Sequence, residues 1–287
     1  MNYSTEKNQT IKGALYLVAT PIGNLADMSE RAIKVLSEAD FIAAEDTRNS
    51  LRLLTHLGIH KPMISYFEHN KAERGVQIVE RLKSGETGAL ITDAGMPAIS
   101  DPGEDLVRLC ADNGICVTAV PGPCAAVTAL TLSGLPTGRF TFEGFLPASK
   151  SERRRALSEL SDEKRTMIFH EAPHKLRATL GDMAEAFGAD RPISLCRELA
   201  KLNEEIFRTT IGGAAEFYAS NEPRGEFVLV VGGTSKIKGD DFWIELSVAD
   251  HVTVYMERGF SKNDAIKMAA KDRKLPKNEI YKQVLDL

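Results

Sequence analysis

The sequence has little of what marks membrane, secreted or nucleotide-binding proteins. No apolar run approaches the roughly 20 residues of a transmembrane helix. The first nine residues are polar and lack a signal-peptide core, so we expect residues 1–12 to form a short disordered tail. The four cysteines form no C-x-x-C pair and are expected to be buried free thiols in a reducing cytoplasm. Neither G-x-G-x-x-G after the first strand nor G-x-x-x-x-G-K-[ST] occurs, which disfavours dinucleotides and nucleoside triphosphates.

What is present is the composition of an ordinary globular protein. The 287 residues are 43% hydrophobic and 26% charged, and they suffice for two domains of roughly 100–200 residues each. The formal net charge of −4 provides no general attraction to nucleic acid. Any contact with RNA must therefore come from local basic patches.

The chain is organised around residues 89–103, where a short apolar run ends in a loop of small residues and prolines. In an open α/β sheet, ligands bind at the carboxyl ends of the strands. Gly95 lets a ligand approach the backbone closely, while Pro97 and Pro102 stiffen the loop. We expect the loop to bind a ligand with hydrogen-bonding edges, such as an adenine or an amino-acid end, through its own N–H and C=O groups.

Strand and helix patterns alternate in the first half of the chain. This alternation predicts an N-terminal α/β domain over residues 13–132, with a parallel sheet and helices on both of its faces. Strands are expected at residues 14–19, 41–44, 62–67, 89–92 and 116–120, and helices at 29–39, up to 57, at 71–83 and at 104–113.

The second half keeps an α/β character, but its crossovers are uneven and some are too short for a helix. We therefore expect a mixed sheet in a C-terminal α/β domain over residues 133–235. Residues 120–126 are expected to form a second strand-end loop, and residues 131–140 the passage between the domains. Strands are expected at residues 140–145, 166–169, 193–196, 206–210 and 227–231, and helices at 151–160, 175–187 and 212–219.

The last part of the chain, residues 236–287, is predicted to be a small helical unit with helix-turn-helix proportions. Its second helix is expected to begin at Ser261 and its third at Pro276. From Arg258 on, eight Lys/Arg stand against four Asp/Glu, a net charge of about +4. This pattern fits contact with nucleic acid and, equally, a solvated helical cap.

Residues 170–174 match the zinc-binding pattern H-E-x-x-H, but that pattern requires an uninterrupted helix. A strand pattern precedes His170, and Pro173 pushes Ala172 out of the helical region. We therefore expect His170 and Glu171 to lie at a strand end, and we expect no metal site.

Two further strand ends carry charged residues. Glu45, Asp46 and Arg48 provide groups for acid–base work and for holding a phosphate, although Asp46 is better suited to cap the following helix. Residues 197–205 place Lys201 at another strand end, where it serves either as a base or in surface ion pairs of little energetic value.

Five blocks of the sequence together resemble one branch of the tetrapyrrole-methylase superfamily, whose members methylate the ribose of a cytidine in 16S rRNA. They are residues 17–25, 44–48, 92–103, 120–123 and 197–201. The resemblance implies a site for S-adenosylmethionine (AdoMet) in a cleft between two α/β domains, and a homodimer. It also implies a cytoplasmic enzyme whose target is the 2′-hydroxyl of a decoding-centre cytidine in the 30S subunit. We expect Arg48 and basic side chains around the cleft and the C-terminal tail to hold the RNA backbone.

By position, the resemblance assigns cofactor contacts to a set of mostly small or apolar residues. They are Pro21, Asp93, Ala94, Gly95, Met96, Ile99, Cys124, Ala125, Glu171, Leu199 and Glu226. The suggested base of tetrapyrrole-methylating relatives falls on Glu45, and we expect Glu45 or Lys201 to deprotonate the hydroxyl. The chain departs from the pattern at Ala200 and at residues 169–174. The alternatives are a methyltransferase for a small tetrapyrrole-like molecule, and a non-catalytic RNA-binding protein of ribosome assembly.

Overall fold

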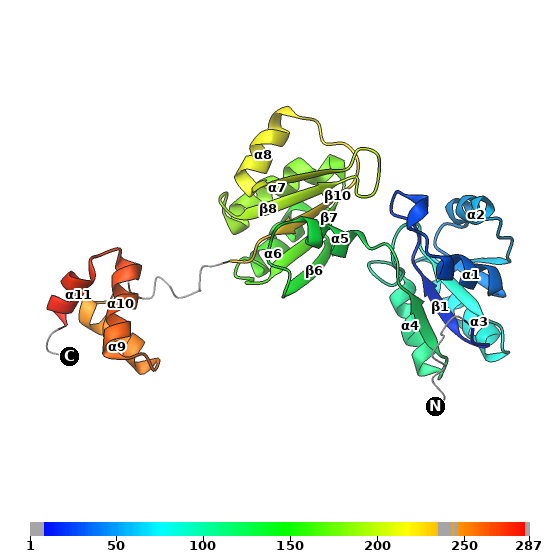
Figure 1. The fold of residues 1–287 in the computed structure, drawn as a ribbon, viewed down its shortest axis with the longest axis horizontal. Helices are drawn as coiled ribbons and strands as arrows, with labels where there is room; N and C mark the ends of the chain where they lie inside the picture. The colour runs from blue at the N-terminus through cyan, green and yellow to red at the C-terminus, as the bar shows by residue number, and fades with distance from the viewer. Residues whose placement is uncertain (1–8, 235–242, 244–245, 285–287) are drawn as a thin grey trace. The chain divides into compact units, whose positions relative to one another are not determined.

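The computed structural model describes residues 9–234, 243 and 246–284 (Figure 1). The chain divides into two compact units: Met1–Ser158 with Arg165–Gly232, and Glu159–Lys164 with Gly233–Leu287. The tail predicted over residues 1–12 lies mostly outside the described residues. Within it, the Thr10 hydroxyl donates to Glu38 (3.1 Å) and the Ile11 N–H to the Tyr16 hydroxyl (2.8 Å).

The first half of the first unit contains a five-stranded sheet in the order β3-β2-β4-β1-β5, and all of its pairings are parallel. Its strands are β1 Leu15–Val18, β2 Phe41–Ala44, β3 Met63–Ser65, β4 Gly88–Ile91 and β5 Val117–Val120. Every residue of β1, β2 and β4 is buried, as expected for continuous apolar runs covered on both faces. The predicted parallel sheet is confirmed.

Helices cover both faces of this sheet, as predicted. Two separate cores form: Leu36 of α1 and Leu54 of α2 belong to one, and Ile78 of α3 and Leu106 of α4 to the other. The helices are η1 Leu25–Asp27, α1 Glu30–Glu38, α2 Thr47–His56, α3 Lys71–Lys83 and α4 Gly103–Asp112. The Asp46 side chain accepts a hydrogen bond from the Arg48 N–H, which confirms its predicted role as the cap of α2.

The second half of this unit contains the predicted mixed sheet, in the order β6-β7-β10-β8-β9. Only β6 and β7 pair in parallel, and the other three pairings are antiparallel. Its elements are β6 Phe140–Phe145, α6 Lys150–Glu159, β7 Thr166–Glu171, α7 Pro173–Phe187, β8 Pro192–Arg197, β9 Glu205–Thr210, α8 Ile211–Ser220 and β10 Phe227–Val231.

Two helices were not predicted: the single 3₁₀ turn η1 and the α-helix α5. Residues expected to be loop and passage form α5, Ala125–Leu132, with Cys124 as an N-cap residue that makes no side-chain cap hydrogen bond. The sequence Ala-Ala-Val-Thr-Ala-Leu-Thr-Leu carries no charged residue and no polar face, so the period that identifies a surface helix is missing. The helix instead packs through Ala129 and Leu130 against Ile168 and Val230 of the second sheet.

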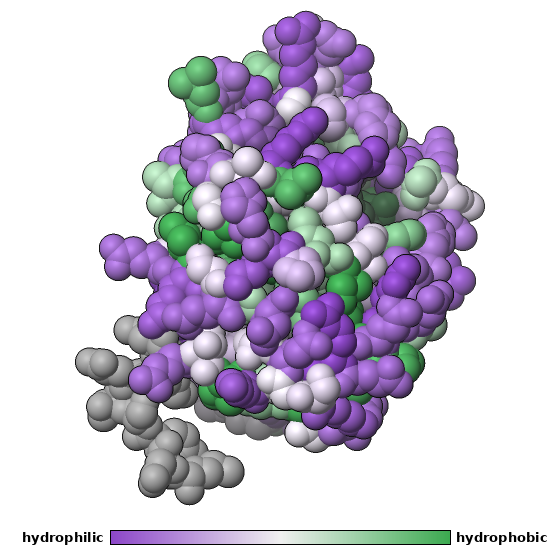
Figure 2. Space-filling view, turned by 90° about the vertical axis from the view of Figure 1, so that its right-hand side faces the viewer, coloured by the Kyte–Doolittle hydropathy of each residue, from purple (hydrophilic) through white to green (hydrophobic). Residues whose placement is uncertain are grey.

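The second unit contains the three helices predicted for it: α9 Val248–Glu257, α10 Lys262–Arg273 and α11 Lys277–Gln283. The Ser261 side chain caps α10 and Pro276 precedes α11, both as expected. The predicted domain boundary at residues 235 and 236 lies outside the described residues. Within the described chain, no helix combines the length and the apolar composition needed to cross a bilayer. The face seen in Figure 2 is covered mainly by hydrophilic side chains, with smaller hydrophobic groups between them.

Candidate active site

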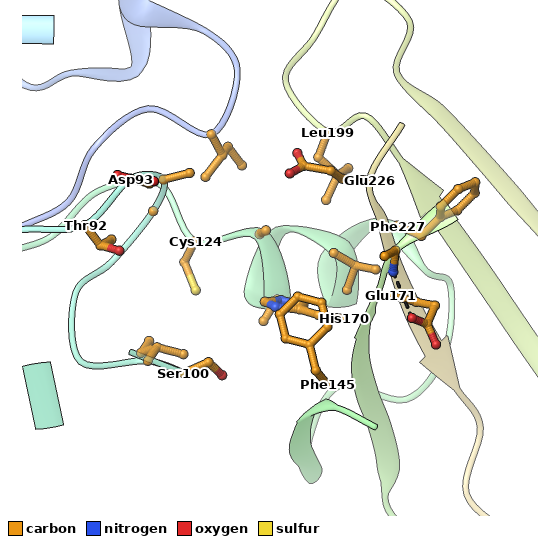
Figure 3. A pocket seen from close by; sticks show the side chains of 18 of the residues that line it. Thr92, Asp93, Ser100, Cys124, Phe145, His170, Glu171, Leu199, Glu226 and Phe227 are labelled. Atoms are coloured by element: carbon orange, nitrogen blue, oxygen red, sulfur yellow. Dashed lines mark hydrogen bonds between the residues drawn. The ribbon is translucent and has the colours of Figure 1, made fainter. Parts of the chain in front are cut away.

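A pocket of about 640 Å³ lies in the first unit, and residues of both sheets and of their loops line it (Figure 3). The loops that follow β1, β2 and β4 contribute from the first half, as does the start of α5; the ends of β6, β7 and β8 and the start of β10 contribute from the second. Its volume lies within the range of ligand sites, about 300–1,000 Å³. The pocket brings together both predicted catalytic residues and every predicted cofactor contact except Pro21, whose neighbour Ile22 lines it instead.

The loop after β4 is held in an unusual backbone conformation. Gly95, Ala98 and Ser100 have φ angles of +86°, +67° and +65°. An Asp101 oxygen accepts hydrogen bonds from the N–H groups of Ala98 (3.1 Å) and Gly103 (2.7 Å). Non-glycine residues with positive φ cost energy and concentrate at functional sites. The loop is therefore fixed by its own Asp101 side chain, and also by Thr20, whose C=O accepts from the Gly95 N–H (3.0 Å) and whose N–H donates to the Gly95 C=O (2.9 Å).

Glu45 lies directly after β2, at the acidic side of the pocket. Its carboxylate accepts a hydrogen bond from the Thr92 hydroxyl (3.4 Å). Partial burial raises the pKa of Glu45, and repulsion from the Asp93 and Asp101 carboxylates raises it further. A carboxylate with a raised pKa is a better proton acceptor than an ordinary glutamate. Its neighbour Asp46 takes no such part, since its carboxylate caps α2.

Lys201 is held in ion pairs on the other side of the pocket. Its Nζ lies 2.8 Å from Glu198 Oε1 and 2.7 Å from Glu226 Oε2. Burial lowers the pKa of Lys201, but the two hydrogen-bonded carboxylates outweigh it, and the pKa is raised overall. Of the two readings of Lys201 that its sequence context left open, base or ion pair, the geometry favours the ion pair.

These ion pairs fix a strained turn. Glu198 and Ala200 have φ angles of +52° and +62°. The Glu198 carboxylate also accepts a hydrogen bond from the Glu226 N–H (3.0 Å), and the Glu198 N–H donates one to the Glu226 carbonyl (3.0 Å). The turn around Leu199 is thus tied to the start of β10, which keeps the Leu199 side chain in place at the pocket.

The end of β7 provides His170 and Glu171. Glu171 is buried, and its carboxylate accepts hydrogen bonds from the Ala172 N–H (2.8 Å) and the Thr179 hydroxyl. Figure 3 shows this carboxylate turned toward the start of α7 and away from Cys124. A contact of Glu171 with a ligand would therefore use its backbone.

The helical zinc reading of residues 170–174 is excluded by the fold. His170 lies on β7, whereas His174 lies in the first turn of α7 behind Pro173, so the two rings do not share a helix face. β7 also extends two residues beyond the strand that we predicted.

Several lining residues were not expected from the sequence. Ser100, Asp101, Phe145, His174, Cys196 and Val228 are among them. For Phe145 a signal existed: Gly144 interrupts a strand pattern that alternates apolar and polar residues, and such a glycine often marks a bulge that redirects the next side chain.

Comparisons with known proteins agree with this architecture. Residues 14–215 match the family of tetrapyrrole (corrin/porphyrin) methylases. Ribosomal RNA small subunit methyltransferase I of Halalkalibacterium halodurans is 50% identical to this chain over 94% of either protein. The protein of that name from Bacillus subtilis is 46% identical, over 94% of this chain and 93% of its own. The one from Escherichia coli O157:H7 is 41% identical over 96% of either protein.

Solved structures share the fold at much lower identity. A cobalt precorrin-4 methyltransferase superposes with a TM-score of 0.57 at 18% identity, over 77% of this chain and 95% of its own. Uroporphyrin-III C-methyltransferase of Thermus thermophilus, complexed with S-adenyl homocysteine, superposes with a TM-score of 0.52 at 17% identity, over 76% of this chain and 97% of its own. The family match and the close relatives show that this chain belongs to the tetrapyrrole methylases, among the ribosomal RNA small subunit methyltransferase I proteins.

Proposed function

We propose that the protein uses AdoMet to methylate the ribose 2′-hydroxyl of a decoding-centre cytidine in 16S rRNA of the 30S subunit. The observation that carries this proposal is the identity of 41–50% to the three small-subunit rRNA methyltransferases described above, over nearly their whole length. The choice of the 2′-oxygen and of a cytidine comes from the resemblance of the five sequence blocks. We expect the protein to act in the cytoplasm as a homodimer.

The residues of the pocket fit AdoMet. The preformed loop from Asp93 to Met96 offers an adenine or an amino-acid end its backbone groups other than those of Gly95, which pair with Thr20. The small residues Cys124 and Ala125 leave room for the ligand to lie against them. The apolar side chains of Ile22, Met96 and Leu199 suit the uncharged parts of such a ligand. When bound, AdoMet supplies an electrophilic methyl group on a sulfonium, which leaves as a neutral thioether when the methyl group is transferred to oxygen.

The chain's own residues then have two tasks. They align the hydroxyl with the methyl group, and this alignment raises the reaction rate because the two reacting groups are already held in the right geometry. Glu45 accepts the hydroxyl proton, for which general-base catalysis contributes about 10²–10⁴-fold. In this proposal Lys201 positions the pocket wall and does not take the proton.

The second unit offers a surface for the RNA. From Arg258 on, its exposed basic residues in the described chain are Arg258, Lys267, Lys271, Lys274, Lys277 and Lys282. They surround a core of its own, built around Val252, Ile266 and Ile280. Phosphate contacts of this kind make binding dependent on salt concentration.

The proposal is tested by methyl transfer from labelled AdoMet to 30S subunits that lack native modification, followed by mapping of the labelled nucleotide. Label on the 2′-oxygen of a decoding-centre cytidine is the expected result. Absence of label from the RNA while AdoMet binds would contradict it. Label on a uroporphyrinoid acceptor in a parallel assay would then indicate the small-molecule alternative, and no transfer at all the assembly-protein alternative.

Lys201→Met is expected to raise the Kd for AdoMet about tenfold and to change turnover at saturation less. The reason is that the turn around Leu199, which lines the pocket, loses the two ion pairs that hold it in place. A shielded charged hydrogen bond is worth about 1.5–3 kcal/mol, and the partly exposed site reduces this value. Calorimetric titration gives the affinity and steady-state kinetics the turnover. Lys201→Arg keeps the charge and should bind AdoMet nearly as wild type does. If Lys201 were instead the base, both variants would lose turnover and keep their affinity.

A further inference from the structure

Phe145 is the last residue of β6 and lies in the pocket wall with 60% of its surface exposed. Single exposed apolar side chains are common on protein surfaces. Among the exposed large apolar residues of the described chain, however, only Phe145 and Ile99 also line the pocket. His170 and Phe145 stand next to each other in Figure 3. The mechanism proposed above gives Phe145 no part in methyl transfer.

A β-bulge directs this side chain into the pocket. Phe142 pairs with Ile168 and Gly144 with Phe169, so β6 has one more residue than β7 between these pairs. Gly144 has a φ of +64°. In a regular strand, side chains three residues apart point to opposite faces. Here the rings of Phe142 and Phe145 both contact the His170 ring, with centroids 5.2 and 5.3 Å away, because the extra residue restores them to one face.

His170 supports the Phe145 ring as an uncharged aromatic partner. The interplanar angle between the two rings is 72°, the edge-on arrangement that aromatic pairs prefer. Burial lowers the pKa of His170, so its imidazole is neutral near pH 7. The Phe145 ring is thus held by one neighbouring ring, and its 60% exposure leaves surface open to a flat ligand.

The position of the ring favours the acceptor over the cofactor. A Cβ on Gly144 would lie 3.4 Å from the Ser100 hydroxyl, so the end of β6 adjoins the far end of the loop, next to Asp101. Asp101 is one of the carboxylates whose charge acts on Glu45. Of the residues of that loop assigned to AdoMet, four lie earlier, at residues 93–96, and only Ile99 lies next to Ser100. The high exposure of Phe145 also places it where a macromolecule arrives.

We infer that Phe145 is the stacking platform for the cytosine whose ribose is methylated, with His170 as its positioning residue. The inference rests on the proposed function. A base in folded rRNA must be turned out of its stack to reach an enclosed methyl donor, and an aromatic face replaces part of the stacking that it loses. The same ring would hold the base plane while Glu45 addresses the 2′-hydroxyl.

The test compares Phe145→Ala, Phe145→Leu and Phe145→Trp in methylation of unmodified 30S subunits. Stacking on a base is worth about 1–3 kcal/mol by alanine substitution, which at about 1.4 kcal/mol per tenfold is a loss of roughly 5- to 150-fold in kcat/KM for the RNA. We expect this loss for the alanine and leucine variants, and activity within a few-fold of wild type for tryptophan. The Kd for AdoMet should stay within twofold in all three.

Phe140→Ala is the matched control, because Phe140 is also exposed (42%) on β6 but does not line the pocket. It should methylate as wild type does. Full activity of Phe145→Leu would overturn the inference, because leucine keeps the apolar volume and lacks the π face. A loss of AdoMet affinity that equals the loss of kcat/KM would also overturn it and place the adenine on the ring. Failure of the wild type to label the RNA would instead overturn the proposed function, and this inference with it.

Discussion

Glu45→Gln is expected to lower the turnover number for rRNA methylation by about 10²–10⁴-fold, the contribution of a general base. Glutamine keeps the size of the side chain and its hydrogen bond with Thr92 while removing the ability to accept a proton. AdoMet affinity should stay within a few-fold of wild type, because the backbone of the loop after β4 is unchanged. Single-turnover kinetics with saturating AdoMet and 30S subunits measures the effect on the chemical step.

The pH dependence gives the same prediction an independent readout. Since burial and the carboxylates of Asp93 and Asp101 raise the pKa of Glu45, the wild-type rate should rise with pH through a pKa above that of an ordinary glutamate. The glutamine variant should lack this rise. Asp46→Asn is the matched control: asparagine caps a helix as well as aspartate does, and Asp46 is turned to α2, so its turnover should stay within a few-fold of wild type.

The raised pKa also has a consequence for stability. Relative to the unfolded chain, a carboxyl group with a raised pKa stabilises the fold at pH values below its unfolded pKa, and this stabilisation is lost as the pH rises through the folded pKa. At neutral pH the ionised Glu45 therefore costs stability. Glu45→Gln should melt at the same temperature as wild type or higher, whereas a lower melting temperature together with lost turnover would indicate that Glu45 is structural.

Most of the first sheet was predictable because its signals are local. The residues of β2 are apolar in an unbroken run, and Ser29 and Asp46 cap the helices on either side of it with their own side chains. The helix α5 was not predictable in the same way, since its stability comes from the second sheet, far away in sequence. A short uncharged segment of small and apolar residues shows no alternation of polar and apolar faces from which a helix could be predicted.

The site shows the same division. The loop from Asp93 to Pro97 could be identified because aspartate, glycine and proline favour turns for direct backbone reasons. The state of Lys201 could not, because one of its two partners, Glu226, lies 25 residues away and meets it only through the pairing of β8 and β10. The pKa of Glu45 likewise depends on Asp93 and Asp101, which follow a different strand. Charges on separate strand ends are related only by the topology of the sheet.

The largest effect expected of a substitution away from the reacting groups is at Gly23, in the loop after β1. A Cβ on Gly23 would lie 2.4 Å from Lys201 Cγ, closer than packed atoms approach, and at a tight 3.1 Å from the Leu199 carbonyl oxygen. The loop after β1 and the turn around Leu199 both border the pocket, so one of them must move. A displacement of about 1 Å in such a site costs on the order of 10²-fold. We expect Gly23→Ala to lower kcat/KM by about 100-fold, measured by steady-state methylation of 30S subunits.

The double variant Gly23→Ala/Lys201→Ala separates steric displacement from other causes. Truncating Lys201 removes the Cγ that the new methyl group meets, while the contact with the Leu199 oxygen remains. The two substitutions should therefore be less than additive, with a coupling energy of about 0.5–3 kcal/mol, as for residues in direct contact. Gly138→Ala is the control, because a Cβ there meets nothing within 4 Å and should leave activity unchanged. Full additivity would mean that the two loops do not approach each other in solution, and that the pocket is wider there than the close contact at Gly23 requires.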